Sequence, residues 1–362
     1  MTTLPEPVPV DGVEGILEAF ASFPLVALGE THRVQEEFDF LTALLHHPAF
    51  PDTVDDVVVE FGNALHQPLV DRFLAGEPVA AADLRRVWRD VVGALYGVLD
   101  APVYEQFFRT VRAVNRRHPI AKRLRVLLGD PPVDWARAKR MEDVRPWVGR
   151  RDEHYAEVVT REVLDRGRRA LLVAGASHFF RISEFDPRAG VVVQRLERQH
   201  PGATFVVLPH CGFAETPEFA VLEARLAAWP TESLAYLGGT WLDAVDARDV
   251  LGADTVAEWG GFLGRDGQPV QRVRLGELVD AYLYLGPRAA LTVSAPNPAI
   301  YRGDPAYLAE LQQRWRLLGA IRWTSSACSP NRHQPTGTPT APGEPAPGTA
   351  TTTTAPASVP QP

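Results

Sequence analysis

The chain is poor in cysteine, in long apolar runs and in positive charge, and each shortage excludes a class of protein. Only Cys211 and Cys328 occur among 362 residues, so we expect no disulfide framework and a reducing cytoplasm. No apolar run reaches the roughly 18 residues that a membrane helix needs. The net charge of -8 gives no support for a nucleic-acid partner, which would favour a basic face.

The motifs of several common enzyme classes are also missing from the sequence. No GxSxG is present, which argues against a serine hydrolase of the α/β-hydrolase type. No GxGxxG follows the first predicted strand and no GxxxxGK[ST] occurs, so dinucleotide and P-loop phosphate chemistry are disfavoured. Residues 1–15 have neither the basic nor the apolar segment of a secretory signal, so we expect a cytoplasmic protein with no membrane partner.

Composition indicates a globular protein with a polar tail. The chain is 45% hydrophobic and 23% charged, which is enough apolar material for a sizeable core. Residues 1–12, rich in proline and acidic groups, are expected to be a flexible arm, and residues 13–333 a single α/β domain. Residues 334–362 consist largely of Pro, Thr, Ala and Gly with one charge, Glu344, and are expected to be disordered.

Short apolar runs alternate with helical patterns along most of the chain. Runs at residues 25–28, 55–61, 123–128, 170–174 and 203–208 predict strands, and weaker signals lie at 234–237 and 282–285. Continuous apolar runs of this kind are typical of strands buried on both faces. The sequence therefore predicts a central, mostly parallel sheet flanked by helices.

Residues 64–119 carry helical spacing and no strand signal, so we interpret them as a helical cap inserted over the edge of the sheet. Its aromatic residues fit either a partly apolar substrate pocket or core packing; they are Trp88, Tyr96, Tyr104 and Phe108. The end of the insertion is basic, which fits a solvated helix face or, alternatively, a funnel for an anionic substrate. The basic residues are Arg109, Arg112, Arg116, Arg117, Lys122, Arg123 and Arg125.

Polar side chains stand at or just after the ends of five predicted strands. If the strands are parallel, these ends share one rim, which is where open α/β sheets bind ligands. Carboxylates and imidazoles together supply what acid/base chemistry or a metal site needs. The residues are Glu30, His32, Glu60, Asp130, His178 and His210.

Each of these residues also fits a structural role when taken alone. The Gly29-Glu30-Thr31-His32 turn fits helix capping by Thr31, and Asp130 before two prolines fits a turn. Cys211 fits a buried inert thiol better than a nucleophile, because no glycine-rich elbow surrounds it. The coincidence of five polar strand ends at one rim is what favours a functional site.

Four short motifs give the chain a resemblance to the erythromycin esterase/ChaN/Tiki-like superfamily over roughly residues 20–215. The motifs are GETH after the first strand, VVVEFGN at the second, Arg151-Asp152 at the start of a helix, and a strand ending GASH. The superfamily joins erythromycin esterases, ChaN-type haem-binding lipoproteins and Tiki-type metalloproteases. We expect neither the lipobox of the ChaN branch nor the membrane anchor of the Tiki branch, and the helical cap is smaller than the esterases usually have.

The resemblance implies roles for individual residues. Glu30 and His32 match the acid/base pair of the esterase branch, Glu60 matches the second-strand glutamate, and His178 matches the late histidine. We take these four as candidate catalytic residues. The candidate substrate-binding residues are Asp130, Arg151, Asp152 and His210.

Two functions follow as hypotheses. In the first, the chain is a hydrolase of a small molecule, in which His32, oriented by Glu30 or Glu60, activates water against an ester, lactone or amide, while His178 stabilises or protonates the oxyanion. A variant of it uses the same side chains to hold zinc or manganese. In the second, the protein binds haem or iron without catalysis. A degenerate scaffold that binds a partner is a third interpretation.

Overall fold

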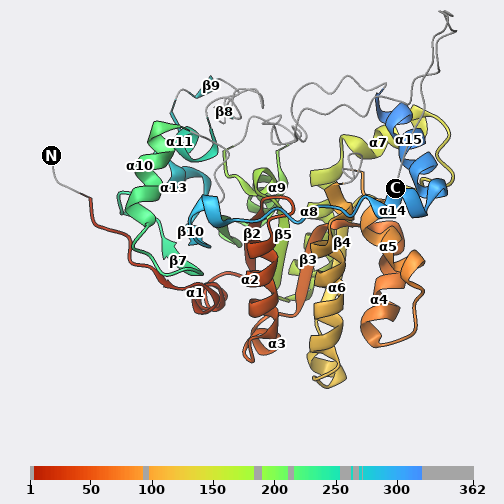
Figure 1. The fold of residues 1–362 in the computed structure, drawn as a ribbon. Coiled ribbons are helices and arrows are strands. Elements are labelled where there is room, and N and C mark those ends of the chain that lie inside the picture. The colour runs from red at the N-terminus through yellow and green to blue at the C-terminus, as the bar shows by residue number, and fades with distance from the viewer. Residues whose placement is uncertain are drawn as a thin grey trace, which may run out of the picture. The chain divides into compact units, whose positions relative to one another are not determined.

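The apolar runs of the sequence form one eight-stranded sheet, shown in the computed structural model of Figure 1. The structure describes residues 4–92, 98–182, 190–210, 216–252, 262–263, 269–270 and 272–319. The strands are β1 (Val10–Asp11), β2 (Leu25–Glu30), β3 (Asp56–Asn63), β4 (Arg125–Asp130), β5 (Ala170–Gly175), β6 (Thr204–Pro209), β7 (Ser233–Tyr236) and β10 (Ala281–Tyr284). A separate antiparallel pair consists of β8 (Phe262–Leu263) and β9 (Pro269–Val270). Each strand that the sequence predicted is present.

Strand direction brings the predicted polar ends to one rim. The order across the sheet is β1-β7-β10-β6-β2-β5-β3-β4. Strands β10, β6, β2, β5, β3 and β4 are parallel, whereas β7 is antiparallel to both of its neighbours. Glu30 pairs with Gly175, and Asn63 pairs with Asp130 after a shift in register beyond Val59. The predicted fold class, a mostly parallel sheet flanked by helices, is confirmed.

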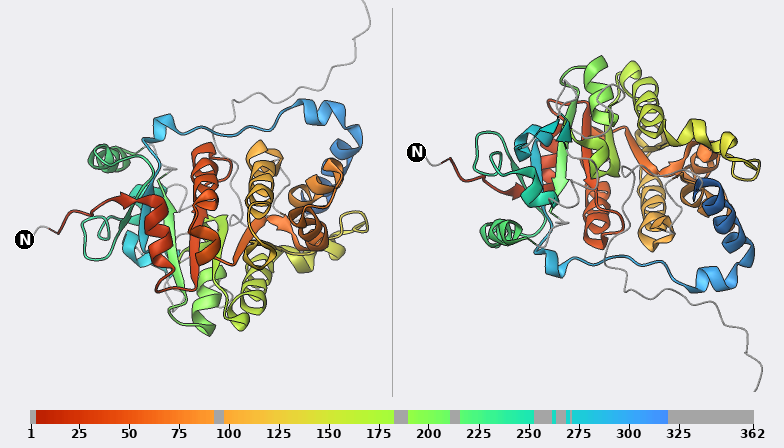
Figure 2. Two further views of the ribbon diagram at one scale, coloured as in Figure 1. Left: turned by 90° about the horizontal axis from the view of Figure 1, so that it is seen from below. Right: turned by 90° about the horizontal axis from the view of Figure 1, so that it is seen from above.

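Helices cover both faces of the sheet (Figure 2). They are α1 (Gly12–Ala19), α2 (Gln35–His46), α3 (Phe50–Thr53), α4 (Gln67–Ala75), α5 (Ala81–Arg89), α6 (Pro102–Asn115), α7 (Met141–Val148), α8 (Arg151–Glu162), α9 (Val192–Gln199), α10 (Pro217–Leu226), α11 (Ala247–Leu251), α13 (Leu275–Leu278), α14 (Ala299–Gly303) and α15 (Pro305–Gly319). The sequence analysis missed α7 and α9, and also the short helices α3, α11, α13 and α14.

Alternation along each strand divides the core between the two faces. Val26 and Leu28 of β2 pack into one hydrophobic cluster with α2 and α6. Leu25 and Ala27 face the other cluster, which holds the apolar residues of α8 and α9. Both faces of β2 are therefore buried, as its uninterrupted apolar run predicts.

The insertion at residues 64–119 forms part of the helical layer, because its last helix, α6, lies beside α2 on one face of the sheet (Figure 2). Phe107 and Phe61 pack edge to face at 5.1 Å, and Trp88 stacks on Phe108 at 5.6 Å. Trp88, Tyr104 and Phe108 are thus core residues, and Tyr96 lies outside the described residues. The insertion reaches the rim through Tyr104, near the beginning of α6.

The basic stretch at residues 109–125 lies at the other edge of the sheet. It runs from the second half of α6 to Arg125, the first residue of β4, so it follows the amino ends of the strands. Part of it is neutralised, since Arg109 bonds to Glu105 and Arg125 to Asp56. The interpretation as a funnel for an anionic substrate at the rim is therefore wrong, because helix α6 carries these charges away from the rim.

A segment near the end of the described chain crosses the turn between β2 and α2. We call residues 291–298 the strap; Figure 1 shows it in blue, running from the β10 side towards α14. The Gln35 amide donates to the Thr292 carbonyl at 2.8 Å, and the Ser294 amide donates to the Arg33 carbonyl at 2.7 Å. The backbone that leads into α2 therefore follows directly from strand β2 on one side and is hydrogen-bonded to the strap on the other.

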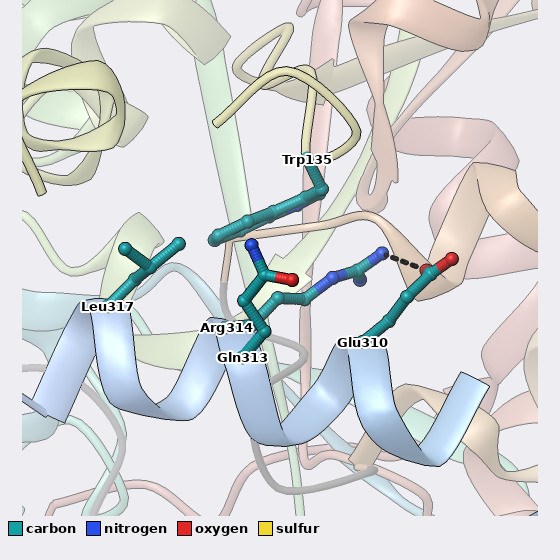
Figure 3. A pocket seen from close by; sticks show the side chains of 5 residues that line it. All are labelled: Trp135, Glu310, Gln313, Arg314 and Leu317. Carbon is teal, nitrogen blue, oxygen red and sulfur yellow. Dashed lines mark hydrogen bonds and ion pairs between the residues drawn. The ribbon is translucent and has the colours of Figure 1, made fainter. Parts of the chain in front are cut away.

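Helix α15 anchors the end of the described chain through Arg314 (Figure 3). The Arg314 guanidinium donates to Asp90 and, at 2.6 Å, to the Arg89 carbonyl, and it lies 5.0 Å from the centre of the Trp135 ring. Figure 3 shows Glu310, one turn earlier in α15, on the same guanidinium. Arg314 is only 3% exposed, so a late element is fixed by a buried ion pair.

The domain boundaries stay a prediction. Within the predicted arm, Val10 and Asp11 pair with β7, and the Pro5 carbonyl accepts a hydrogen bond from the Trp241 amide. The predicted disordered tail, residues 334–362, lies outside the described residues, as do Cys211 and Cys328.

A substitution at Gly129 tests the packing beneath the rim. A Cβ there would lie 2.2 Å from Tyr155 Cδ2, and Tyr155 is fixed because its hydroxyl donates to the Val58 carbonyl at 2.6 Å. We expect Gly129→Ala to lower the free energy of unfolding by about 1–3 kcal/mol, measured by urea denaturation. Gly149→Ala is the control, because nothing lies within 4 Å of its added Cβ. Equal stability of the two variants would contradict this packing.

Candidate functional site

The first part of the site is the turn between β2 and α2. Strand β2 is buried along its whole length and ends at Glu30, so the turn begins inside the protein. The Glu30 carboxylate accepts a hydrogen bond from the Tyr104 hydroxyl at 2.8 Å, and its Oε1 lies 3.5 Å from His32 Nδ1. The side chain of His32 is 31% exposed while that of Glu30 is 3% exposed, so the imidazole borders solvent and its carboxylate does not.

The turn is strained at Arg33, which has φ of 73° and is not glycine. A left-handed backbone costs an ordinary residue on the order of 1–3 kcal/mol and persists only where its surroundings enforce it. The Arg33 amide points at Glu30 Oε1 at 3.4 Å, and its carbonyl is held by the strap. The strain is thus the local consequence of placing Glu30 and His32 together at the rim.

Glu37 closes the turn from the first turn of α2. Its Oε2 accepts a hydrogen bond from the Thr31 amide at 2.7 Å, and the residue is 5% exposed. Burial raises the pKa of Glu37 well above its usual value, and the Glu30 charge adds to the rise. Burial and the Glu30 charge therefore both favour the protonated form of the Glu37 carboxyl.

The second part of the site is the Glu60 carboxylate of β3, which three elements hold. Oε1 accepts from Arg151 Nη2 at 2.6 Å and faces His178 Nε2 at 3.2 Å, and Oε2 accepts from the Gly175 amide at 2.7 Å. Burial would raise the pKa of Glu60, but the His178 and Arg151 charges hold it well below its usual range. Glu60 is therefore a fixed, ionised group.

His178 is held as an imidazolium by two carboxylates. Its Nδ1 lies 2.6 Å from Asp152 Oδ1, and its Nε2 faces Glu60. Burial would lower the pKa of His178, but the Asp152 and Glu60 charges raise it to about 10. A ring with both nitrogens engaged in this way cannot take a proton, so His178 acts through its charge.

Asp130, at the end of β4, shares Arg151 with Glu60. Its Oδ1 accepts from Arg151 Nε at 2.8 Å and its Oδ2 from the Val92 amide at 2.7 Å. Burial raises the pKa of Asp130 to about 6, and the Arg151 charge opposes that rise. Glu60 faces Arg151, the Gly175 amide and the charged His178, whereas Asp130 has only Arg151 and the Val92 amide. This difference explains why the pKa of Glu60 is lowered while that of Asp130 is raised.

Gly175 joins the two parts of the site. A Cβ at this position would lie 3.2 Å from His32 Cε1, 3.4 Å from His32 Nε2 and 3.4 Å from Glu60 Oε2. The His32 ring and the Glu60 carboxylate therefore lie over the same glycine, at the end of β5. The structure thus brings together seven of the eight predicted site residues at one rim.

His210, the eighth predicted residue, is separate from this cluster. Its ring is fully buried, stacks on Phe219 at 5.3 Å and contacts the Tyr282 hydroxyl at 2.7 Å through Nδ1. Burial lowers its pKa. His210 lies after β6 on the side towards β10, where it serves as a packed and hydrogen-bonded core histidine.

A small hollow with a cavity volume of about 10 Å³ borders the charged network. It is lined by Glu60, Gly129, Asp130, Arg151, Asp152, Tyr155, His178 and Val192. This is about the space that one water molecule needs.

The residues do not fit a divalent metal. In the part of the chain that the structure describes, no group of three or more His, Cys, Asp and Glu side chains is arranged to hold one. A ligating imidazole needs a free lone pair, and both nitrogens of His178 face carboxylates. We therefore assign no step to zinc or manganese.

Sequence reasoning missed several residues that hold the site. Tyr104 lies far from Glu30 in the chain, and its only signal was its place in a helical aromatic pattern. Asn63 stood in the VVVEFGN motif, but its role was not inferred: its side-chain amide donates to the carbonyls of Asp90 and Val133 at 2.7 and 2.9 Å. These bonds place residues 90–92 beside the rim, where the Val92 amide meets Asp130.

Comparison with known proteins finds structures and no sequence relatives. No protein-family model matches the chain, and a search of curated proteins finds no match. Similar solved structures include a Bacillus cereus protein (10% identity, TM-score 0.47, 78% of this chain and 95% of that one) and a protein described as a succinoglycan biosynthesis protein (11%, 0.44, 78% and 94%). A third is ChaN of Campylobacter jejuni, described with cofacial haem binding (12%, 0.32, 58% and 92%).

The last of these structures carries the name ChaN, one of the families that the sequence motifs resemble. With identities of 10–12% and TM-scores below 0.5, the likeness carries no information on the site residues or the activity of this chain.

No helix among the described residues has both the length and the apolar character needed to cross a membrane.

The Asp152 charge is expected to set the protonation of His178. Asp152→Asn removes that charge and should lower the His178 pKa from about 10, measured by NMR titration of the imidazole. A histidine whose pKa is raised in the folded state stabilises the fold at low pH. The contribution of His178 to the free energy of unfolding should therefore fall as the pH rises from about 6.5 to about 10. In Asp152→Asn this fall should be smaller, because the His178 pKa is raised less. Glu157→Gln, on the same helix, is the control, and an unchanged His178 pKa in Asp152→Asn would contradict the arrangement.

Glu37 gives a pH-dependent test with the opposite charge. A carboxyl whose pKa is raised in the folded state opposes folding more strongly as pH rises above its unfolded value, near 4.5. Glu37→Gln should therefore stabilise the protein relative to wild type at pH 7, and the difference should vanish below about pH 4.5. Denaturant unfolding across this range measures it, with exposed Glu142→Gln as the control. A pH-independent difference would show that Glu37 is ionised in the fold.

Proposed function

We propose that the chain is a hydrolase in which His32 activates water for attack on an ester, lactone or amide carbonyl. The observation that carries the proposal is the position of His32. It is a partly exposed imidazole set between the buried carboxylate of Glu30 and the fixed, ionised carboxylate of Glu60. A general base needs charge that stabilises its protonated form, and the two carboxylates beside the ring supply it.

Glu30 orients the ring for this role. We assign the proton to Nδ1, because Glu30 Oε1 lies on that side of the ring at 3.5 Å, and we therefore take Nε2 as the nitrogen that accepts a proton. The Tyr104 hydroxyl bonds to the same Glu30 oxygen, so the carboxylate is fixed in turn. Nε2 faces the Gly175 side of the rim, next to Glu60.

The reaction follows from these positions. Water transfers a proton to His32 Nε2 as its oxygen bonds to the carbonyl carbon, and the imidazolium then gives that proton to the leaving alcohol or amine as the bond to it breaks. The Glu60 charge stabilises the imidazolium between the two steps. A positioned general base of this kind contributes about 10²–10⁴ in rate.

His178 and Arg151 support the reaction through their positive charges, which act on Glu60. In place of the oxyanion contact that the sequence suggested for His178, both ring nitrogens face carboxylates. The two cations hold Glu60 ionised and add positive charge beside the hollow. Positive charge stabilises a developing anion most strongly when it is already fixed in position before the reaction. Asp130 and Asp152 keep these cations in place.

The test is a substrate screen with His32→Ala. Wild-type protein should hydrolyse at least one of a set of p-nitrophenyl esters, simple lactones and anilides, and His32→Ala should lose at least 100-fold in kcat/KM. His46→Ala, an exposed histidine near the far end of α2, should retain wild-type rates. Turnover that survives His32→Ala would refute the assignment.

The purified protein also needs an absorption spectrum. Haem binding without catalysis, the second function that the resemblance implies, would give a Soret band and stoichiometric iron. A colourless protein that turns over an ester supports the hydrolase, whereas a Soret band with no turnover would replace it with the haem-binding alternative.

A further inference from the structure

Arg33 differs from the other buried or half-buried arginines whose contacts the structure describes in having no side-chain bond. Arg151, Arg168 and Arg314 each bond to a buried carboxylate, and the half-buried Arg112, Arg123 and Arg195 each donate to a backbone carbonyl. The guanidinium of Arg33 has no ion pair with any described residue, and its Nε is shielded from solvent with no hydrogen-bond partner there. Buried donors are normally satisfied, so this one is available to a ligand.

The backbone fixes where this side chain begins. Arg33 follows His32 directly, and its left-handed conformation is enforced by Glu30 on one side and by Ser294 of the strap on the other. A less demanding residue for this conformation is glycine or asparagine. An arginine at this position therefore costs stability that a glycine would not cost.

Backbone hydrogen bonds place Arg33 between the His32 turn and the strap, because its amide donates to Glu30 Oε1 and its carbonyl accepts from the Ser294 amide. The Arg33 charge also opposes the rise that burial causes in the pKa of Tyr104 and of Tyr301. Tyr104 bonds to Glu30 at the rim, and Tyr301, on α14, bonds to Asp100.

The carboxylates on these two sides are already occupied. Glu30 accepts from Tyr104 and faces His32, and Asp100 accepts from Arg89, Tyr301 and Tyr307. The donors of Arg33 are left for an acceptor that comes from outside. A guanidinium presents donors in a planar fork that matches a carboxylate or a phosphate.

We propose that Arg33 is a subsite for an anionic group, a carboxylate or a phosphate, on the molecule that His32 hydrolyses. The proposal rests on the proposed function for the identity of the reaction, and it narrows the substrate to an anionic ester, lactone or amide. Arg33 binds the anion while His32, the preceding residue, acts on the carbonyl.

Matched esters test the subsite in kinetics. p-Nitrophenyl butyrate is neutral, and mono-p-nitrophenyl succinate has a similar length with a terminal carboxylate. Arg33→Gln should lower kcat/KM for the succinate ester about 10- to 100-fold, mainly through KM, and should change butyrate hydrolysis less than twofold. Arg116→Gln removes an equal charge at the end of α6, away from the rim, and should leave both esters unchanged.

Arg33→Gly keeps the test independent of folding. Glycine accepts the positive φ, so this variant should melt at or above the wild-type temperature while losing the same preference for the succinate ester. If the ratio of kcat/KM for the two esters is the same in wild type and in the Arg33 variants, the subsite proposal is wrong. The proposed hydrolase function would not be affected by that result.

Direct binding separates the subsite from catalysis. Calorimetric titration of the full chain with succinate and with inorganic phosphate should show binding of at least one, abolished in Arg33→Gly and retained in Arg116→Gln; which probe binds identifies the anion. Arg33-dependent binding in a protein that cleaves no ester would refute the proposed function and keep the subsite. Binding of neither probe, or binding unaffected by Arg33→Gly, would overturn the subsite.

Discussion

The Glu60 carboxylate is the interaction on which the rim depends. It is an ionised group in a buried position, which is tolerable only because donors surround it. Those donors come from three places in the chain: Arg151 at the start of α8, the Gly175 amide at the end of β5 and His178 just after it. Any movement of one strand end relative to another would leave this charge unpaired, so the carboxylate fixes the rim as well as occupying it.

The same dependence extends to late parts of the chain. Asp90 accepts hydrogen bonds from His66, Arg86 and Arg314, the last of these on α15. Two residues later, the Val92 amide bonds to Asp130, which shares Arg151 with Glu60. The α15 contact is therefore linked to the site by a short series of buried polar bonds, although α15 itself contributes nothing to the rim.

Local pattern was sufficient for the sheet and for most of the rim. Each apolar run became a strand, and the polar residues at the carboxyl ends of β2, β3 and β4 and just after β5 converge because parallel strands end at one edge. The pattern failed for His210, which also follows a strand, because nothing local distinguishes a histidine facing the rim from one stacked on Phe219. It also failed for Tyr104, whose partner Glu30 is 74 residues away; only the packing of α6 against α2 brings the two together.

The two histidines of the rim show why residue type alone does not define a role. Both stand beside Glu60, and both matched the resemblance equally well. His178 lies between Glu60 and Asp152, and these two charges raise its pKa to about 10, so it is charged throughout the physiological range. His32 has one carboxylate on its Nδ1 side and borders solvent. The surroundings of each ring, and not its residue type, therefore separate a histidine that is fixed as a cation from one that borders solvent.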